Sequence, residues 1–249
     1  YHAYAKYFDT YHPDILFSTS IVSAIDMDFM KEARAHGIPT LSMTKGWDLT
    51  SKMLYRFVPD QIIVLNEPMK ESLVEVQKIA PDRITVTGFP QFDFYRRPEL
   101  LRARTEYLTS RGIDPSKKMI VFGSEGMWAP KDYLIAEMIA KWVSGNELVE
   151  PCTLLIRPHF TDINSDKFDF LEHLPNVVLD RSLKKSELFM DNWDPGEEET
   201  KLFVNTLHHM ALMITIASTL TLDSVCFDKP VINVTYGALF HNEVDLTHV

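Results

Sequence analysis

Short runs of Val, Ile and Leu alternate with longer amphipathic segments along the whole chain. The runs are bounded by turn residues and are apolar at nearly every position, which is typical of strands buried on both faces of a parallel sheet. We expect strands at residues 15–18, 40–43, 61–65 and 84–87 in the first half, and at residues 119–122, 153–157, 177–179, 212–216 and 231–234 in the second half.

The segments between these runs have helical spacing. An apolar stripe from Met69 to Ala80 predicts one helix. Residues 131–143 are apolar nearly all round, and we expect Trp142 there to belong to the core. Helices that alternate with buried strands are the crossover connections of parallel sheets. The hydrophobic pattern therefore predicts an α/β chain.

The series of strands is interrupted near residues 88–111, where a turn at Gly88 leads into a polar helical stretch. We expect residues 1–95 to form the C-terminal part of an N-terminal, acceptor-side Rossmann-like domain. Residues 96–249 would then form a nucleotide-donor-binding Rossmann-like domain, truncated at its C-terminus. The predicted fold class is α/β, with two Rossmann-like domains whose parallel sheets face a cleft and an incomplete N-terminal domain. A start at Tyr1, inside a helical pattern, indicates a fragment of a longer protein.

The composition of the chain mainly excludes certain classes of binding partner. The net charge is -10, from 25 Lys and Arg against 35 Asp and Glu, and no basic stripe is visible. This argues against nucleic acid as the main partner and against electrostatic docking of this segment on an anionic membrane. The sequence shows no long apolar run, signal peptide or metal-ligand cluster, so we predict a cytoplasmic protein, or one at the inner face of the membrane, without a metal. Cys152 and Cys226 are expected to be buried, free thiols.

A glycine-containing turn follows the first strand of the second series. It contains Gly123, Ser124 and Gly126. Glycines between a strand and a helix let a phosphate approach the backbone, and the N–H groups of the helix start can bind it. An ordinary tight turn has a similar composition, so both interpretations stay open for this motif taken alone.

The strongest motif begins where the strand 212–216 ends. Ser218 and Thr219 can cap the next helix and, with Thr221, offer hydroxyl groups to an anion at its N-terminus. Asp223 lies about one turn further, where a carboxylate can accept hydrogen bonds from both hydroxyls of a ribose. The alternative is a plain helix cap with a solvent-facing Asp.

Further polar residues follow other predicted strands. Arg157 and His159 come after the strand 153–157; an arginine suits a phosphate, and a histidine suits a phosphate or acid–base chemistry. Both residues could instead be structural. In the first half, Lys45, Trp47 and Asp48 are candidates for contacting an acceptor or a sugar, although any such sheet edge offers residues of these types.

Taken together, these motifs resemble the GT-B glycosyltransferases, a group of enzymes with two Rossmann-like domains. The same fold group includes the UDP-N-acetylglucosamine 2-epimerases and the CDP-glycerol glycerophosphotransferases. Residues 86–93 resemble the V-x-G-x-P-x-x-D stretch that closes the N-terminal domain, and residues 123–126 resemble the glycine loop of MurG-like transferases. Residues 157–159 resemble an R-P-H-P segment, and Asp223 stands seven positions before Pro230, as does the ribose-binding acid of the donor motif.

The sequence also departs from the family pattern. Phe160 replaces the usual proline, Asp223 replaces the commoner glutamate, and Leu220 stands where many relatives have glycine or alanine. The first strands of the N-terminal domain, where many GT-B enzymes keep the acceptor site and the catalytic base, are missing from this chain. The resemblance therefore leaves the catalytic base unassigned.

The resemblance implies a metal-independent transferase that uses a nucleotide-diphosphate-activated sugar or polyol donor, such as a UDP-sugar, in the synthesis of cell-surface carbohydrate or glycolipid. The donor is a substrate, so no cofactor is expected; the acceptor would be a carbohydrate or a lipid-linked molecule, with peripheral membrane association through missing segments. Arg157 and His159 would offset charge on the leaving group. Two alternatives are an epimerase using Asp48 and Glu67, and a non-catalytic nucleotide-binding subunit of a carbohydrate-synthesis complex.

Overall fold

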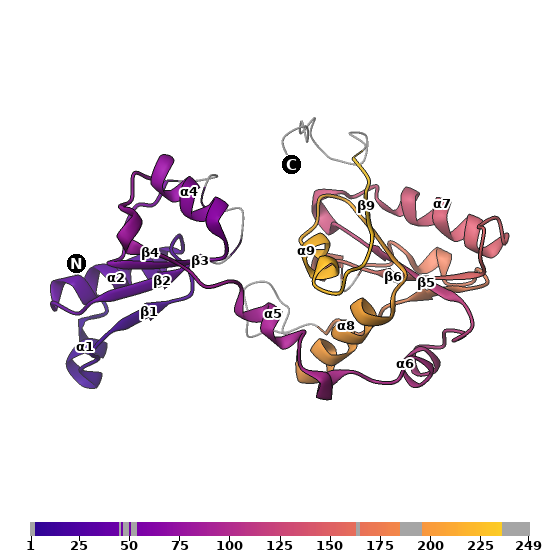
Figure 1. Ribbon diagram of the computed structural model, residues 1–249, viewed down its shortest axis with the longest axis horizontal. Helices are drawn as coiled ribbons and strands as arrows, with labels where there is room; N and C mark the ends of the chain where they lie inside the picture. Colours follow the sequence, from indigo (N-terminus) through magenta and orange to yellow (C-terminus); the bar gives the residue numbers. More distant parts are fainter. Residues whose placement is uncertain are drawn as a thin grey trace. The chain divides into compact units, whose positions relative to one another are not determined.

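A computed structural model of the chain describes residues 3–44, 46, 50, 54–162, 165–184 and 196–235. The chain divides into two compact units, Tyr1–Asp93 and Phe94–Val249, each with its own parallel sheet (Figure 1). All the strands expected from the hydrophobic pattern are present in the described part of the chain, to within one residue at either end. The functional roles assigned to residues 1–95 and 96–249 stay predictions.

The first unit contains a four-stranded sheet in the order β1-β2-β3-β4. Its strands are β1 (Leu16–Ser18), β2 (Thr40–Met43), β3 (Gln61–Val64) and β4 (Ile84–Val86). Its helices are α1 (Ala5–Tyr11), α2 (Ala24–Ala35), α4 (Glu67–Glu75) and the 3-10 turn η1 (Pro81–Arg83). Its largest cluster of buried side chains comprises Ile21, Ile62, Val64, Met69, Leu73, Ile79 and Ile84.

Helix α4 is shorter than its apolar stripe predicted. The helix begins after Asn66, whose side chain accepts a hydrogen bond from the backbone N–H of Met69 at 3.0 Å, and it ends at Glu75 rather than Ala80. Lys78 has a positive φ of 57°, and Ala80 is extended because Pro81 disfavours helical backbone in the residue before it. The stripe continues into a turn, since Ile79 still packs on the core.

The second unit contains a five-stranded sheet in the order β7-β6-β5-β8-β9. Its strands are β5 (Lys118–Gly123), β6 (Cys152–Arg157), β7 (Val177–Leu179), β8 (Leu212–Thr215) and β9 (Val231–Asn233), and all their pairings are parallel. Its α-helices are α6 (Arg104–Ser110), α7 (Tyr133–Ser144), α8 (Glu197–His209) and α9 (Leu220–Val225). The shorter helical elements are α5 (Pro90–Phe94, at the division), η2 (Pro98–Leu100), η3 (Gly126–Trp128), η4 (Phe160–Asp162) and η5 (Asp169–Leu171).

Helices cover both faces of this second sheet (Figure 1). Successive residues of a strand point to opposite faces, so β5 contributes Ile120 and Phe122 to one cluster and Met119 and Val121 to the other. The first cluster includes the buried side of α7, and the second includes residues of α6 and α8. Burial on both faces explains why these strands read as continuous apolar runs.

Two expectations about individual side chains are wrong. Trp142 lies on the outer side of α7 with 39% of its surface exposed, because Ala136, Ile139, Ala140 and Val143 already supply the face of α7 that meets the sheet. Cys226 is exposed and Cys152 is only partly buried, although both are free thiols. Within the described residues, no helix combines the length and the apolar character needed to cross a membrane.

Candidate functional site

The order of the second sheet creates a point where the chain reverses direction across it. From β5 the chain moves outward to β6 and β7, then returns to the other side of β5 as β8 and β9. Ligands of open α/β sheets bind outside the carboxyl ends of the strands at such a switch point. Gly123, the last residue of β5, pairs with both Arg157 and Thr215, so the turns after β5, β6 and β8 begin side by side.

This arrangement brings together three of the motifs singled out in the sequence, those at residues 123–126, 157–159 and 218–223. The acceptor-side candidates Lys45, Trp47 and Asp48 lie outside the described residues. Glu67, the second carboxylate of the epimerase alternative, is the first residue of α4 in the other unit and is exposed.

The two glycines of the β5 turn permit close packing of neighbouring elements. A Cβ atom on Gly123 would lie 2.3 Å from the Cδ1 atom of Leu220, at the start of α9. Gly126 has a positive φ of 63°, and a Cβ atom there would lie 2.2 Å from the hydroxyl of Thr161 and 2.6 Å from Nδ1 of His159. Gly123 thus makes room for Leu220, the bulky residue that departs from the family pattern, and Gly126 lets the β5 and β6 turns touch.

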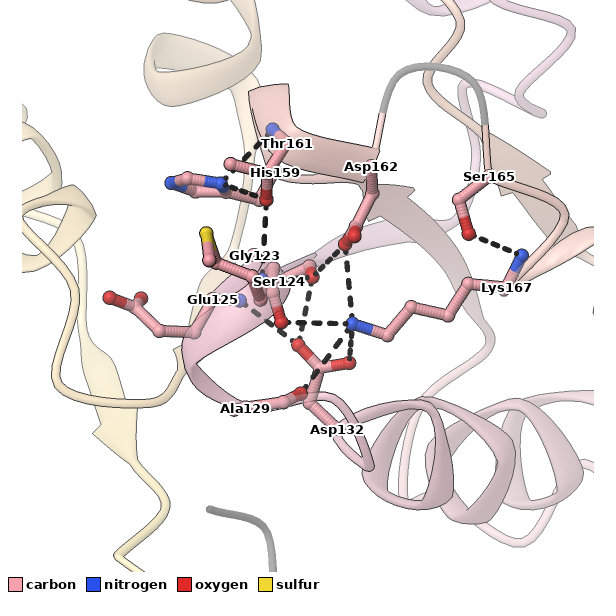
Figure 2. A network of polar contacts seen from close by, with 12 residues as sticks. Gly123, Ser124, Glu125, Ala129, Asp132, His159, Thr161, Asp162, Ser165 and Lys167 are labelled. Atoms are coloured by element: carbon pink, nitrogen blue, oxygen red, sulfur yellow. Dashed lines mark hydrogen bonds and ion pairs between the residues drawn. The ribbon is translucent and has the colours of Figure 1, made fainter. Parts of the chain in front are cut away.

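Ser124 belongs to a buried cluster that we call the Lys167 network, formed by Ser124, Asp132, Asp162 and Lys167 (Figure 2). The Ser124 hydroxyl lies 2.8 Å from Oδ2 of Asp132 and 3.1 Å from Oδ2 of Asp162, and it accepts a hydrogen bond from the N–H of Gly126. The predicted contact of Ser124 with a diphosphate would have to displace one of these partners.

Lys167 supplies the positive charge of this network. Its Nζ atom lies 2.7 Å from Oδ1 of Asp132 and 3.2 Å from Oδ2 of Asp162, and it also donates to the carbonyl oxygens of Gly126 and Ala129. The lysine ties the β5 turn to the segment after β6 and fixes the shape of both. Sequence reasoning missed this network because Asp132, Asp162 and Lys167 are spread along the chain and lie in no recognisable motif.

His159 lies on the turn after β6, against the β5 turn. Its Nδ1 atom accepts a hydrogen bond from the backbone N–H of Thr161 at 3.2 Å and lies 2.8 Å from the hydroxyl of the same residue. Because Nδ1 is an acceptor, the proton of the neutral ring is on Nε2. Burial lowers the pKa of His159, and Lys167 adds to the effect while Asp162 opposes it. A neutral ring with an Nε2–H donor is the form expected near pH 7.

Arg157 is held in a buried ion pair. Its guanidinium lies 2.5 Å from Oδ2 of Asp180 and 4.5 Å from the ring centre of Phe203. Arg111 binds the other oxygen of Asp180. Burial would raise the pKa of Asp180, but the two guanidinium groups outweigh it and hold the pKa at about 2. Arg157 is thus a structural partner of Asp180, and its predicted role toward a leaving group stays a prediction.

The turn from Ala217 to Thr221, which we call the Ser218 turn, differs from the predicted helix cap. The N-cap residue is Thr219, whose backbone is helical (φ -59°, ψ -17°) and whose side chain makes no capping hydrogen bond. A capping side chain needs extended backbone at that position. Ser218 accepts a long hydrogen bond of 3.5 Å from the N–H of Leu220 instead. The hydroxyl of Thr221 is buried without a hydrogen-bond partner among the described residues.

Asp223, the predicted ribose ligand, lies on α9 and has only 6% of its surface exposed. One of its carboxylate oxygens accepts a hydrogen bond from the hydroxyl of Tyr95 at 2.6 Å. Burial raises the pKa of Asp223, whereas Tyr95 and Arg157 lower it. The solvent-facing alternative is therefore wrong, and Tyr95 is a partner that the sequence did not suggest.

Glu125 is the acidic residue of the β5 turn, and sequence reasoning passed over it although it lies between Ser124 and Gly126. Its backbone N–H donates to Asp132 at 2.9 Å, while its side chain points away from Lys167 (Figure 2). The Oε2 atom of its carboxyl group is buried without a hydrogen-bond partner among the described residues. Burial raises the pKa of Glu125 to about 7, and Asp132 adds to the effect while Ser218 opposes it.

The described part of the chain contains no group of three or more His, Cys, Asp or Glu side chains arranged to hold a metal ion. The groups at this edge are hydroxyl groups, backbone N–H groups, a neutral imidazole and the carboxyl groups of Glu125, Asp132 and Asp223, whose pKa values are raised chiefly by burial. Such groups can bind an anion and donate or accept protons.

No protein-family model matches the chain, and no curated protein matches its sequence. Solved structures do match the fold of the chain. UDP-GlcNAc 2-epimerase from Neisseria meningitidis, bound to UDP-GlcNAc, has a TM-score of 0.62 and 14% identity over 92% of this chain and 61% of its own. A variant of the wall teichoic acid polymerase TagF with CDPG has a TM-score of 0.54 and 15% identity, over 92% of this chain and 55% of its own.

A glycosyltransferase from Rickettsia africae has a TM-score of 0.51 and 14% identity, over 92% of this chain and 59% of its own. The chain thus spans between one half and two thirds of the length of each of these proteins. At this level of identity the likeness shows the fold. Each of the two units of this chain, taken by itself, has a Rossmann-like fold with a parallel sheet.

Proposed function

We propose that this chain is the nucleotide-binding part of a transferase that uses a nucleotide-diphosphate-activated sugar or polyol donor in the synthesis of a cell-surface carbohydrate or glycolipid. The observation that carries the proposal is the meeting of the β5 turn with the Ser218 turn at the switch point of the second sheet, where Gly123 packs closely against Leu220. Proteins of the same fold were solved with UDP-GlcNAc or CDPG, which agrees with a donor of this chemistry.

In this proposal the diphosphate lies against the Ser218 turn, and its pentose reaches Asp223. Helix α9 has only six residues, so its dipole is small, and the attraction for an anion rests on the hydroxyl and N–H groups of the turn. His159 would donate its Nε2 proton to the leaving diphosphate, because donors fixed in place before the reaction stabilise charge that develops in the transition state. Arg157 would act only through its charge, since Asp180 occupies its guanidinium.

The donor is a substrate in this scheme, and we propose neither a metal nor an organic cofactor. The acceptor would be a carbohydrate or a lipid-linked molecule, and the reaction would take place in the cytoplasm or at the inner face of the membrane. The acceptor-side candidates Lys45, Trp47 and Asp48 remain part of the proposal.

The first test is a thermal-shift panel of UDP, CDP, GDP, ADP and dTDP on the full-length protein. A selective ligand at 100 times its Kd stabilises the folded state by about 2.7 kcal/mol, so one nucleotide should raise the Tm clearly above the others. The variant Ser218→Ala should lose that rise while melting like the parent without ligand. If none of the five nucleotides raises the Tm, the proposal is wrong.

An epimerase is the second candidate, because the structure with the TM-score of 0.62 is a UDP-GlcNAc 2-epimerase. The full-length protein would be incubated with UDP-GlcNAc in the absence of an acceptor, and the sugar would be analysed by NMR. Inversion at C2 without an acceptor would replace the transferase proposal by the epimerase one. Tight binding without turnover on any acceptor would favour the non-catalytic subunit.

A further inference from the structure

The side chain of His159 is held in place by the next two residues of the turn after β6. The ring centre of Phe160, the residue that replaces the family's proline, lies 4.1 Å from the ring centre of His159. At the edge of the ring, Nδ1 lies 2.8 Å from the hydroxyl of Thr161 and accepts a hydrogen bond from the N–H of the same residue at 3.2 Å. Both contacts meet one nitrogen, and the other nitrogen, Nε2, points away from Thr161 and Lys167 (Figure 2).

The hydroxyl of Thr161 also joins this ring to the β5 turn. Its oxygen accepts a hydrogen bond from the backbone N–H of Met127 at 3.2 Å. Because Nδ1 of His159 accepts from the Thr161 N–H, this nitrogen carries no proton, and the Thr161 hydroxyl can only donate to it. The hydrogen bonds thus run in one direction, from Met127 through the hydroxyl to Nδ1. This direction leaves the proton of the neutral ring on Nε2.

Gly126 makes this close contact between the two turns possible. Its backbone has a positive φ of 63°, and a Cβ atom there would lie 2.2 Å from the Thr161 hydroxyl and 2.6 Å from Nδ1 of His159. A side chain at residue 126 would therefore push both groups away from the β5 turn. The backbone of the β5 turn is thus shaped to receive the paired Thr161 and His159 side chains.

We propose that Thr161 is a positioning residue whose hydroxyl fixes His159 as the Nε2–H tautomer, so that His159 presents an N–H group to the diphosphate of the nucleotide. The inference rests on the function proposed above and concerns the same site. Thr161 contacts the ring and the β5 turn, and it acts on the nucleotide through His159 without touching it.

The tautomer decides whether the neutral ring of His159 attracts or repels an anion. With its proton on Nε2, the ring donates a hydrogen bond to a phosphate oxygen, which is an acceptor. With its proton on Nδ1, the ring would turn a lone pair toward the same oxygen. A single hydroxyl on the far side of the ring therefore controls the polarity of the nitrogen that points away from it.

The tautomer can be measured on the full-length protein without any ligand. Long-range proton–nitrogen NMR spectra distinguish a protonated ring nitrogen from an unprotonated one, and the resonances that vanish in His159→Ala identify His159. At about pH 8 the ring is neutral, because the ordinary histidine pKa is about 6.5 and burial lowers the pKa of His159. The parent protein should show Nε2–H and an unprotonated Nδ1. Thr161→Val should shift both resonances toward a mixture of tautomers, and Thr161→Ser should restore them.

Calorimetry of the full-length protein tests whether the effect reaches the nucleotide, with whichever of UDP, CDP, GDP, ADP and dTDP binds most tightly. Thr161→Val should weaken binding about three- to tenfold, the usual worth of one hydrogen bond, and Thr161→Ser should restore it. In the His159→Ala background, Thr161→Val should cause no further loss, because Thr161 acts through the ring. Thr109→Val, which changes an exposed threonine of α6, is the matched control and should bind like the parent.

Failure of the inference and failure of the proposed function give different results. A proton on Nδ1 in the parent protein, or an unchanged tautomer in Thr161→Val, would overturn the role of Thr161 and leave the proposed function intact. Equal losses of affinity from Thr161→Val with and without the His159 ring would also overturn it. Failure of all five nucleotides to bind the parent would overturn the proposed function and the inference with it. The spectrum of the parent needs no Thr161 variant, so it decides even if Thr161→Val does not fold.

Discussion

Two polar clusters flank the β5 turn, and they differ in how completely their groups are paired. In the Lys167 network, Oδ1 of Asp132 makes no hydrogen bond of regular geometry, but the Lys167 ammonium lies 2.7 Å from it and 3.2 Å from Oδ2 of Asp162, so both buried carboxylates have a counter-charge (Figure 2). Beside the Ser218 turn, Oε2 of Glu125 and the hydroxyl of Thr221 are buried without hydrogen-bond partners among the described residues. Buried polar groups are normally paired, so the unpaired ones are where a ligand or a proton has most to contribute.

This difference separates structural from ligand-binding residues more clearly than position in a motif does. Ser124 and Arg157 stand in motifs that indicated phosphate binding, yet their polar groups are engaged with Asp132 and Asp180. Glu125 was not singled out, but it has the perturbed pKa and the unpaired oxygen. Four substitutions test this difference between the paired and the unpaired polar groups.

Lys167→Met should give the largest loss of stability, about 3–5 kcal/mol, because it leaves the carboxylates of Asp132 and Asp162 buried without a counter-charge. Urea unfolding of the full-length protein measures the loss. The matched control is Lys118→Met, which removes an exposed lysine 3.9 Å from Glu150 and should change little. Equal effects of the two substitutions would mean that the Lys167 network does not stabilise the fold.

Asp180→Asn should cost about 2 kcal/mol at pH 7 and test whether Arg157 is structural. The folded pKa of Asp180, about 2, lies below its ordinary value of 3.8, so the stabilisation is fully present above about pH 4 and is lost as the pH falls toward 2. Unfolding curves of the variant and the parent should therefore converge in acid. Asp169→Asn, in an exposed pair with Arg181, serves as the control. A difference that persists unchanged at pH 2 would contradict the ion-pair explanation.

Asp223→Ala should weaken nucleotide binding by about 1–3 kcal/mol, the usual cost of losing a hydrogen bond to a charged group. Tyr95→Phe removes the hydroxyl that Asp223 binds but keeps the carboxylate, so it should affect binding much less. Calorimetry with the nucleotide selected by the thermal-shift panel measures both. Equal losses in the two variants would indicate that Asp223 acts with Tyr95 as a structural pair and does not bind the ribose.

Thr219→Val should give the smallest change in stability, below about 0.5 kcal/mol, because Thr219 makes no capping hydrogen bond that could be lost. If its hydroxyl faces the donor, nucleotide affinity should still fall by about 0.5–1.5 kcal/mol. Thermal melting without and with nucleotide separates the two quantities. A large loss of stability without ligand would restore the helix-cap interpretation that the sequence suggested.

The sequence located the turns of the candidate site correctly because strand ends are a local property. Apolar runs that stop at Gly123, Arg157 and Ala217 identify the carboxyl edge without knowledge of the fold. The partners across that edge could not be predicted. Tyr95 meets Asp223 across more than a hundred residues of chain, and no local pattern marks either one as the other's partner.

The sequence alone predicts the α/β class and the two series of strands, because alternation of apolar and polar segments follows from burial of each strand between helices. Tertiary structure decided which polar groups are free for a ligand. The order β7-β6-β5-β8-β9 brings Asp180 to Arg157 and Leu220 to Gly123. A hydroxyl or guanidinium has few hydrogen-bonding positions, and its long-range neighbours determine how many of them remain for a ligand.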